Sequence, residues 1–248
     1  MKTLRSFGIG LILVASATLT FLSCSAMLYI SGSGQMSREI RAVNDFDAVV
    51  LNGSGELTIE QGSSPSLTVE AEDNIISYVE STIEGRTLTL GLRADSWSHS
   101  IFTTRPTRYT LIVRDLTNVT VNGSGGAHIG AVRTPFMTVN VNGSGPVVVE
   151  SLSASRLTAT ITGSGSVECS GVVDRSEASI LSSGSAKLSG LSCNQAVVYI
   201  AGSGSCSVDA RSSLDVSILG SGSVEYCGNP AITSLILGSG RLRPARAL

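Results

Sequence analysis

The sequence predicts an all-β protein, a parallel β-helix (solenoid) with coils of about 18–20 residues. Three observations predict it: a Gly-Ser-Gly motif that recurs at a nearly constant interval, apolar residues that alternate on both sides of it, and the composition. Charged residues make up 15% of the 248 residues and aromatic residues 4%, and the chain holds 27 glycines. This composition suits short strands and turns, and an apolar content of 42% argues against a disordered chain.

Residues 1–30 are interpreted as a targeting segment. Two basic residues precede an apolar run over residues 7–22, and the letters FLSC follow, ending at Cys24. The pattern resembles a bacterial lipoprotein signal, in which the cysteine after the cleavage site is lipidated. Two alternatives stay open: cleavage after Ala26, which releases a secreted protein, and an uncleaved run to Ile30, which is long enough to span a membrane. In all three cases the rest of the chain is exported.

Residues 31–115 are expected to form the first coils and a cap over them. One GSG motif ends at Gly34, and another ends at Gly55 in the register of the later repeats. The letters SLTVEA, RTLTLGL and TRYTLIVRDL that follow are typical of strands. A mixed β region here would protect the first coil, because an open coil end is an unpaired strand edge. The core positions expected around Gly55 are Val49, Leu51, Leu57 and Ile59.

One short helix is expected inside this cap. The letters EDNIISYVESTIEG end at Gly85, and glycine often ends helices. Ile76, Val79 and Ile83 would lie roughly on one face of that helix. The full prediction is therefore a β-helix capped by an N-terminal mixed β region with one short helix.

Residues 116–243 are expected to form the regular coils. The second glycine of each GSG recurs every 18 to 20 residues, and in one copy Ser182 replaces the first glycine. This interval matches one coil of a parallel β-helix, in which like residues stack at about 4.8 Å. The second glycines are Gly125, Gly145, Gly165, Gly184, Gly204, Gly222 and Gly240.

Apolar and polar residues alternate around each motif. Counted from the second glycine, positions −6, −4, +2 and +4 are apolar, and positions −5 and −3 hold mostly polar or small residues such as Thr120 and Asn122. A period of two is typical of strands with one buried face. A further apolar position at +7 indicates a third short strand in each coil. Its members are Val132, Leu152, Val172 and Leu191.

Each GSG is expected to be a corner between strands. Glycine tolerates a positive φ, and the serines would stack in a ladder whose hydroxyls can bond a neighbouring coil or water. A phosphate cradle is the alternative, but neither a helix signal nor a lysine follows the glycines. Glycosylation-like triplets near the motifs are most simply by-products of the repeat. They begin at Asn52, Asn118, Asn122 and Asn142.

Four cysteines follow Cys24. Cys169 and Cys206 lie on core columns and are interpreted as small buried hydrophobic residues, whereas Cys193 and Cys227 lie at other positions. No two adjacent coils share a cysteine column, so we expect no disulfide between coils. Because no CxxC or Cys/His spacing suggests zinc, we expect no metal or other cofactor.

The chain resembles a known family. The letters GSGQMSREIRAVNDFDAVVLNGSGELTIEQG, the acidic VEAEDN segment and the stacked GSG coils are similar to the family described as "putative auto-transporter adhesin, head GIN domain", over roughly Gly32 to Leu242. The resemblance implies one β-helical domain over residues 31–248, of a kind found on bacterial envelope proteins that are often lipoproteins. It implies no catalytic motif.

One outward row offers a candidate for catalysis. Glu168 and Lys187 share position +3 on adjacent coils, either as a surface ion pair or as the centre of a polysaccharide-active enzyme. No G-x-S-x-G or H-E-x-x-H motif is present. His99 lies in an expected loop and His128 at an outward position, so we expect neither to be catalytic. The aspartates that form no row are Asp174, Asp209 and Asp215.

The expected function is that of a non-catalytic cell-envelope module, an adhesin or scaffold that presents an extended β surface to a glycan or protein ligand. The net charge of −2 gives no reason to expect a nucleic-acid partner. We expect an outer-membrane lipoprotein facing the periplasm or the surface, with a secreted or membrane-anchored protein as alternatives. The functional alternatives are a polysaccharide-active enzyme and an end-to-end homo-oligomer, since the last coil ends without a helical cap.

Overall fold

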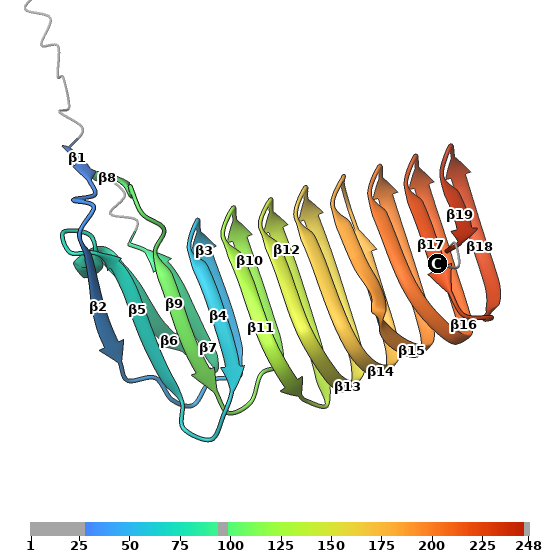
Figure 1. Cartoon of the computed structure of the whole chain (residues 1–248). Coiled ribbons are helices and arrows are strands. Elements are labelled where there is room, and N and C mark those ends of the chain that lie inside the picture. The colour runs from blue at the N-terminus through green and yellow to red at the C-terminus, as the bar shows by residue number, and fades with distance from the viewer. Residues whose placement is uncertain (1–27, 94–98, 246–248) are drawn as a thin grey trace, which may run out of the picture.

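The computed structural model describes residues 28–93 and 99–245 of the chain. Within these ranges, 17 strands form one continuous sheet wound as a flattened solenoid, and two more strands form a small separate sheet (Figure 1). The solenoid has a front face, whose strands follow each GSG corner, and a back face, whose strands lead up to the next corner. Successive coils pair in parallel, so the predicted β-solenoid fold is confirmed.

The first coil consists of β3 (Ala48–Gly53) and β4 (Glu56–Gln61), on either side of a GSG corner. The second coil, β10 (Asn118–Gly123) and β11 (Gly126–Arg133), stacks on them in parallel although about 56 residues of chain lie between. Residues at the same repeat position are direct partners in this pairing, which confirms that the copy at Gly55 belongs to the repeat.

The later coils are formed by long strands. After β12 (Phe136–Gly143), each strand leaves one corner, crosses the front face, turns through the lower bend and climbs the back face to the next corner. These strands are β13 (Pro146–Gly163), β14 (Ser166–Ile180), β15 (Ser185–Gly202) and β16 (Ser205–Gly220). The last strands are β17 (Ser223–Cys227), β18 (Ala231–Gly238) and β19 (Arg241–Pro244).

The predicted core columns are buried. From Val49 in the first coil to Val224 in the last but one, the apolar positions around the corners are less than 5% exposed and form one hydrophobic cluster. In the terminal coil Ile236 and Leu242 are only partly buried, because no further coil within the described ranges covers them. The aliphatic columns therefore form one continuous core along the solenoid axis, which hydrophobic burial stabilises.

The expected third strand is wrong in detail. The ladder continues through the lower bend without a separate strand, and Val132, Leu152 and Leu191 are buried there. Val172, predicted to be buried, is 60% exposed, and Val173 is buried instead. The pairing of β13 with β14 shifts at the bend, so that Gly171 lies opposite Leu152. The coil that contains β14 is one residue shorter than the coil before it, and the register shift at the bend accommodates this missing residue.

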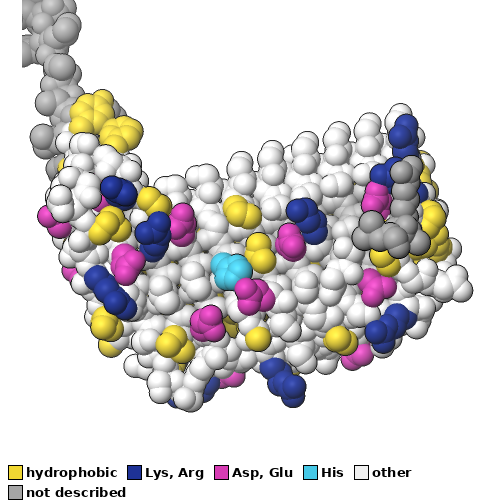
Figure 2. All heavy atoms as spheres, in the orientation of Figure 1, with side chains coloured by type: hydrophobic (Ala, Val, Ile, Leu, Met, Phe, Trp, Pro, Cys, Tyr) yellow, Lys and Arg dark blue, Asp and Glu magenta, His cyan; other side chains and the backbone are white. Residues whose placement is uncertain are grey.

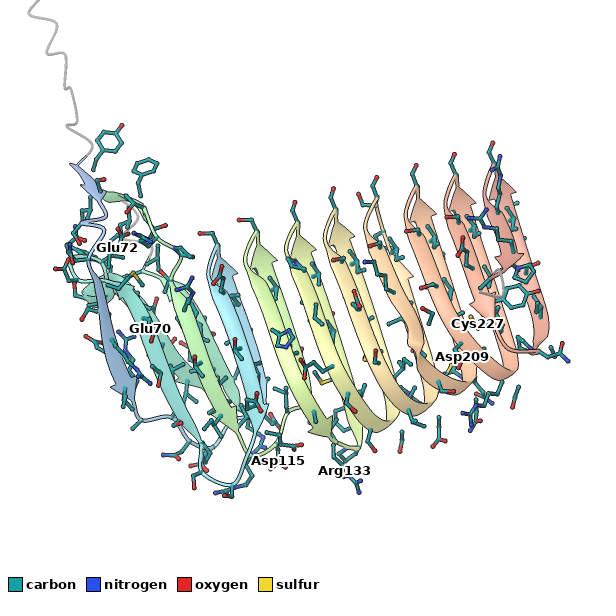
Figure 3. The ribbon with its side chains drawn as sticks, in the orientation of Figure 1. Glu70, Glu72, Asp115, Arg133, Asp209 and Cys227 are labelled. Atoms are coloured by element: carbon teal, nitrogen blue, oxygen red, sulfur yellow. The ribbon has the colours of Figure 1, made fainter. Side chains whose placement is uncertain are left out.

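The two glycines of a corner are needed for different reasons. Gly123 has a φ of 113°, which glycine adopts without strain, as predicted. Gly145 has no such φ, but a Cβ there would lie 1.6 Å from the carbonyl oxygen of Gly125 in the coil below. The corners stack backbone on backbone, and the N–H of Ser144 donates to the oxygen of Gly123 at 2.9 Å. The serine hydroxyls point outward into solvent along this edge (Figure 3).

The cap contains strands where a helix was predicted. Within the predicted helix segment, residues 72–85, only a three-residue 3-10 turn, Ile76–Tyr78, is helical. β6 (Val79–Glu84) and β7 (Thr87–Leu92) form an antiparallel hairpin that continues the back face. The β-branched residues of this segment favour a strand, and Gly85 makes the hairpin turn with a φ of 60°. Apolar residues three and four apart could not distinguish the two structures over so short a length.

Antiparallel strands close the front face. β5 (Ser66–Glu72) lies between β2 (Met36–Arg41) and β9 (Arg108–Val113) and is antiparallel to both, while β9 is parallel to β4. The first GSG, which ends at Gly34, therefore precedes a cap strand rather than a coil. β9 confirms the strand predicted to lead into the coils.

The separate sheet stands at the N-terminal end of the molecule. It is formed by β1 (Leu28–Ser31) and β8 (His99–Phe102), which pair in parallel. The backbone of His99 thus lies in a strand, not in the expected loop. The part of the chain described here contains no helix with the length and hydropathy needed to span a membrane.

Candidate functional site

Glu168 and Lys187 lie opposite each other on the front face, as predicted from their shared column. The Lys187 Nζ is 3.6 Å from the Glu168 Oε2, and both side chains are more than half exposed. An exposed ion pair of this kind contributes at most about 1 kcal/mol to stability. The geometry is that of a surface salt bridge, in which each charge is balanced by the other.

Two further polar pairs lie on the front face. The Arg108 Nε is 2.9 Å from the Glu56 Oε2, and the His128 Nε2 is in hydrogen-bond contact with the Glu150 Oε1 at 2.8 Å. His128 points outward, as predicted. Figure 2 shows charged side chains of both signs scattered over this face rather than gathered in one patch. The front face therefore offers no strong field for a charged ligand.

The three aspartates do not form a site. The Asp209 carboxylate accepts a hydrogen bond from the Ser192 hydroxyl at 2.9 Å, and Asp174 accepts one from the Asn194 amide at 3.3 Å, while Asp215 is exposed on the back face. Over residues 28–93 and 99–245, no three His, Cys, Asp or Glu residues come together as a metal site would require.

Three of the four described cysteines are buried thiols. Burial raises the pKa of Cys169 and Cys206 to about 12 and that of Cys193 to about 11. Cys193 was not predicted to be in the core. It is buried because the strand register shifts at the lower bend and turns its side chain inward. Cys227 is half-buried, and all four are free thiols. Cys24, the predicted lipidation site, lies outside the described residues.

The back face carries an asparagine ladder near the corners of its first coils. The Asn122 amide donates to the Asn52 side-chain oxygen at 2.9 Å, and the Asn142 amide donates to the Asn122 oxygen at 3.0 Å. Thr162 continues the column in the next coil. The glycosylation-like triplets at these positions are therefore explained by a structural role, since each amide links one coil to the next.

The same column becomes apolar in the second half of the solenoid. We name as the leucine stripe the four residues at position −3 of adjacent coils, Leu181, Ala201, Leu219 and Leu237. The three leucines are 46%, 37% and 57% exposed. This column was predicted to be mostly polar or small, which holds for the first coils only. The signal was present in the sequence, as leucine recurring at a position that faces water.

The terminal coil, β18 and β19, is exposed at the end opposite the cap (Figure 1). β18 pairs with β16, and β19 pairs with β17, but no described strand covers their outer edges. Ile232 and Leu235 add 40% and 54% exposed side chains to this end. An open edge with apolar side chains is an unusual surface for a monomer, because it can pair with another chain.

Glu72 is a buried acid that the sequence did not single out. Its carboxylate accepts hydrogen bonds from the Gly34 N–H at 2.8 Å, from the Thr104 N–H at 2.9 Å and from the Thr104 hydroxyl. The Thr104 hydroxyl bond, aided by these backbone N–H groups, holds the pKa of Glu72 below its ordinary value, although burial acts in the opposite direction. We name this arrangement the Glu72 clamp; it lies at the base of the β1–β8 sheet (Figure 3).

The sequence matches the family model described as "putative auto-transporter adhesin, head GIN domain" over residues 45–230. No curated protein matches it. A solved structure described as a putative lipid binding protein from Parabacteroides distasonis is 26% identical, with a TM-score of 0.75 over 88% of this chain and 100% of that one. A putative adhesin from Bacteroides fragilis is 22% identical, with a TM-score of 0.81 over 87% and 100%. A putative adhesin from Parabacteroides merdae is 22% identical, with a TM-score of 0.67 over 88% and 99%.

Proposed function

The chain belongs to the family described as "putative auto-transporter adhesin, head GIN domain", and from this premise we propose that it is a non-catalytic, exported module of the cell envelope. It binds a partner through the exposed back face of its solenoid. Nearly every other column has a structural role: inward residues form the core, corner glycines allow stacking, and front-face charges neutralise one another. The leucine stripe is the feature left without such a role.

The leucine stripe supports a protein as the ligand. Its side chains are aliphatic, and they lie in a row across four coils of the back face. Sugars are usually bound by aromatic rings and hydrogen-bonding groups, whereas an aliphatic row gains free energy from burial against another apolar surface. Exposed apolar patches of this kind mark interaction sites on soluble domains.

The test is a binding assay with the full chain immobilised in detergent and probed with envelope proteins, purified glycans and peptidoglycan. Lipid vesicles are included because one similar structure is described as lipid-binding. Replacing Leu181, Leu219 and Leu237 together with Asn should weaken protein binding by about tenfold or more. Asn already occupies this column at Asn122 and Asn142, so the backbone accommodates it.

The matched control is Val148→Asn, which changes an outward apolar residue on the front face and should leave binding unchanged. Equal thermal stability of both variants and the parent would show that the fold is intact. Absence of binding to every probe, or binding by the triple variant at full strength, would overturn the proposal.

The catalytic alternative is tested by glycan turnover. We expect the parent protein to cleave none of a panel of envelope and plant polysaccharides, because Glu168 and Lys187 form an exposed ion pair without a third group. Turnover that Glu168→Gln or Lys187→Ala abolishes would instead establish an enzyme.

We propose lipidation of Cys24 as the anchor of the exported chain. The support is the apolar run with basic residues before it and the position of the cysteine after it. Mass spectrometry of the mature N-terminus should show a diacylglyceryl group on Cys24. A mature chain beginning after Ala26, or one that keeps its first residues, would replace this anchor by one of the two alternatives.

A second candidate function, self-assembly, follows from the terminal coil. We propose that two copies meet at their open ends, because β18 and β19 present unpaired backbone edges and the exposed side chains of Ile232 and Leu235. Light scattering should show a mass that doubles with concentration, and Leu235→Lys should keep the chain monomeric. A parent protein that is monomeric at every concentration would exclude this assembly.

A further inference from the structure

The β1–β8 sheet carries two exposed aromatic rings. Tyr29 and Phe102 lie with their ring centroids 5.8 Å apart, and they are 64% and 58% exposed. Neither belongs to the hydrophobic core of the described residues. Figure 2 shows an exposed apolar group at the end of the molecule that carries the β1–β8 sheet. We name the two strands with these rings the aromatic tip.

The aromatic tip is held firmly to the solenoid. The Gly32 N–H donates to the Phe102 oxygen at 2.9 Å, and the Glu72 clamp binds both the segment that follows β1 and the segment that follows β8. The Asn74 amide adds a hydrogen bond to the Ser31 oxygen at 2.8 Å. Burying a carboxylate costs free energy unless hydrogen bonds satisfy it, and here the donors come from both segments, so the clamp holds them together.

The tip is also close in sequence to the proposed anchor. Cys24 precedes Leu28, the first residue of β1, by four residues, which span at most about 14 Å even when fully extended. A chain attached to a bilayer at Cys24, or by the apolar run before it, therefore keeps the tip within reach of the lipid headgroups. Tyrosine and other amphipathic aromatic residues are enriched at this depth, where the ring is apolar and the hydroxyl stays hydrated.

We propose that the aromatic tip docks into the interfacial region of the same lipid bilayer that anchors the chain. Tyr29 and Phe102 insert among the headgroups, and the Glu72 clamp fixes the angle at which the solenoid leaves the membrane. This inference rests on the proposed membrane anchor, and it adds a second membrane contact that orients the solenoid.

The experiment places a fluorescent reporter at the tip of the full chain. The single native tryptophan is first removed by Trp97→Phe, and Tyr29→Trp or Phe102→Trp is then introduced. Each protein is reconstituted into phosphatidylcholine–phosphatidylglycerol vesicles with or without brominated acyl chains, which quench nearby tryptophan. The matched control is Phe136→Trp, since Phe136 is a 54% exposed aromatic residue on β12, away from the tip.

Brominated lipid should quench the two tip tryptophans about twofold or more and leave the Phe136→Trp control unquenched, as expected for a residue at the interface. If the chain floats with the vesicles but the tip is quenched no more than the control, the docking proposal is wrong and the anchor stands. If the chain does not float with the vesicles, the anchor is wrong and the docking proposal fails with it.

Discussion

At the scale of single residues, Ser176 is an exception to the apolar core. It occupies an inward position of β14, between Leu157 and Ala196 in the neighbouring coils, and its hydroxyl is buried without a hydrogen-bond partner within the described structure. A buried polar group left unpaired costs about 1–3 kcal/mol, so the position weakens the core rather than supporting it.

Ser176→Ala should therefore raise the free energy of unfolding by about 1 kcal/mol, because it removes the unpaired hydroxyl and little volume. Urea unfolding followed by circular dichroism measures the change. Ser179→Ala, which alters an outward residue of the same strand, serves as control and should stay within about 0.5 kcal/mol of the parent. A destabilised Ser176→Ala variant would mean that the hydroxyl has a partner after all.

The cysteines make a prediction that depends on pH. The folded thiols of Cys169, Cys193 and Cys206 have pKa values near 11 to 12, well above the ordinary value, because burial disfavours the thiolate. At pH 8 a maleimide should label Cys227, which is half-buried, and leave these three untouched until urea is added. Peptide mass spectrometry assigns the labels, and rapid native labelling of Cys169 or Cys206 would contradict the burial.

The same shifts affect stability in alkali. A thiol whose pKa is raised on folding contributes fully below its unfolded value, about 8.5, and the contribution is lost as the pH rises towards the folded value. Alkaline solutions should therefore weaken the fold between about pH 8.5 and the folded pKa, since the unfolded chain ionises there and the folded chain does not.

At the scale of the elements, the corners are the most restrictive part of the repeat. Gly145→Ala should lower the free energy of unfolding by on the order of 3 kcal/mol, because the added Cβ meets the backbone oxygen of Gly125 and the coil must shift. The matched control is Gly130→Ala, whose added Cβ would meet only the flexible Glu60 carboxylate at 3.4 Å. Thermal unfolding compares them, and equal melting temperatures would refute the close approach of the corners.

The sequence allowed the elements of the repeat to be predicted more fully than those of the cap. Each position of the repeat occurs in several copies, so its apolar character is clear even where one copy differs. Residues such as Val121 and Val147 could therefore be placed in the core. The segment from Ile76 to Glu84 occurs once, and its apolar spacing fits a helix or a strand equally well. The segment becomes a strand because it pairs with β7, and the local sequence pattern does not reveal this pairing.

At the scale of the whole molecule, the candidate surfaces lie where the repeat pattern changes. Cys24, the proposed lipidation site, was visible in the sequence as a single residue, and the ion pair of Glu168 and Lys187 was visible as one shared column. The aromatic tip was not, because β1 and β8 are separated by more than 60 residues of chain and meet only in the fold. Likewise, the Glu72 clamp depends on two distant segments that no motif connects.

The two ends of the solenoid should differ in local stability. The cap covers the first coil, whereas among the described residues the terminal coil has a neighbouring coil on one side only. In a repeat protein each coil is stabilised mainly by its neighbours, so amides of β18 should exchange with solvent at least about tenfold faster than those of β12. Hydrogen exchange with mass spectrometry measures this difference. Equal protection at both sites would indicate that a second copy covers the open end.

The stacked corners also allow the number of coils to change in evolution without disrupting the fold. Because each coil contacts only the coils before and after it, duplication or loss of one 20-residue unit leaves every other corner intact. Each such event moves the terminal coil by about 4.8 Å relative to the aromatic tip at the opposite end. The number of coils thus sets the length of the solenoid, and with it the distance between the aromatic tip and the terminal coil.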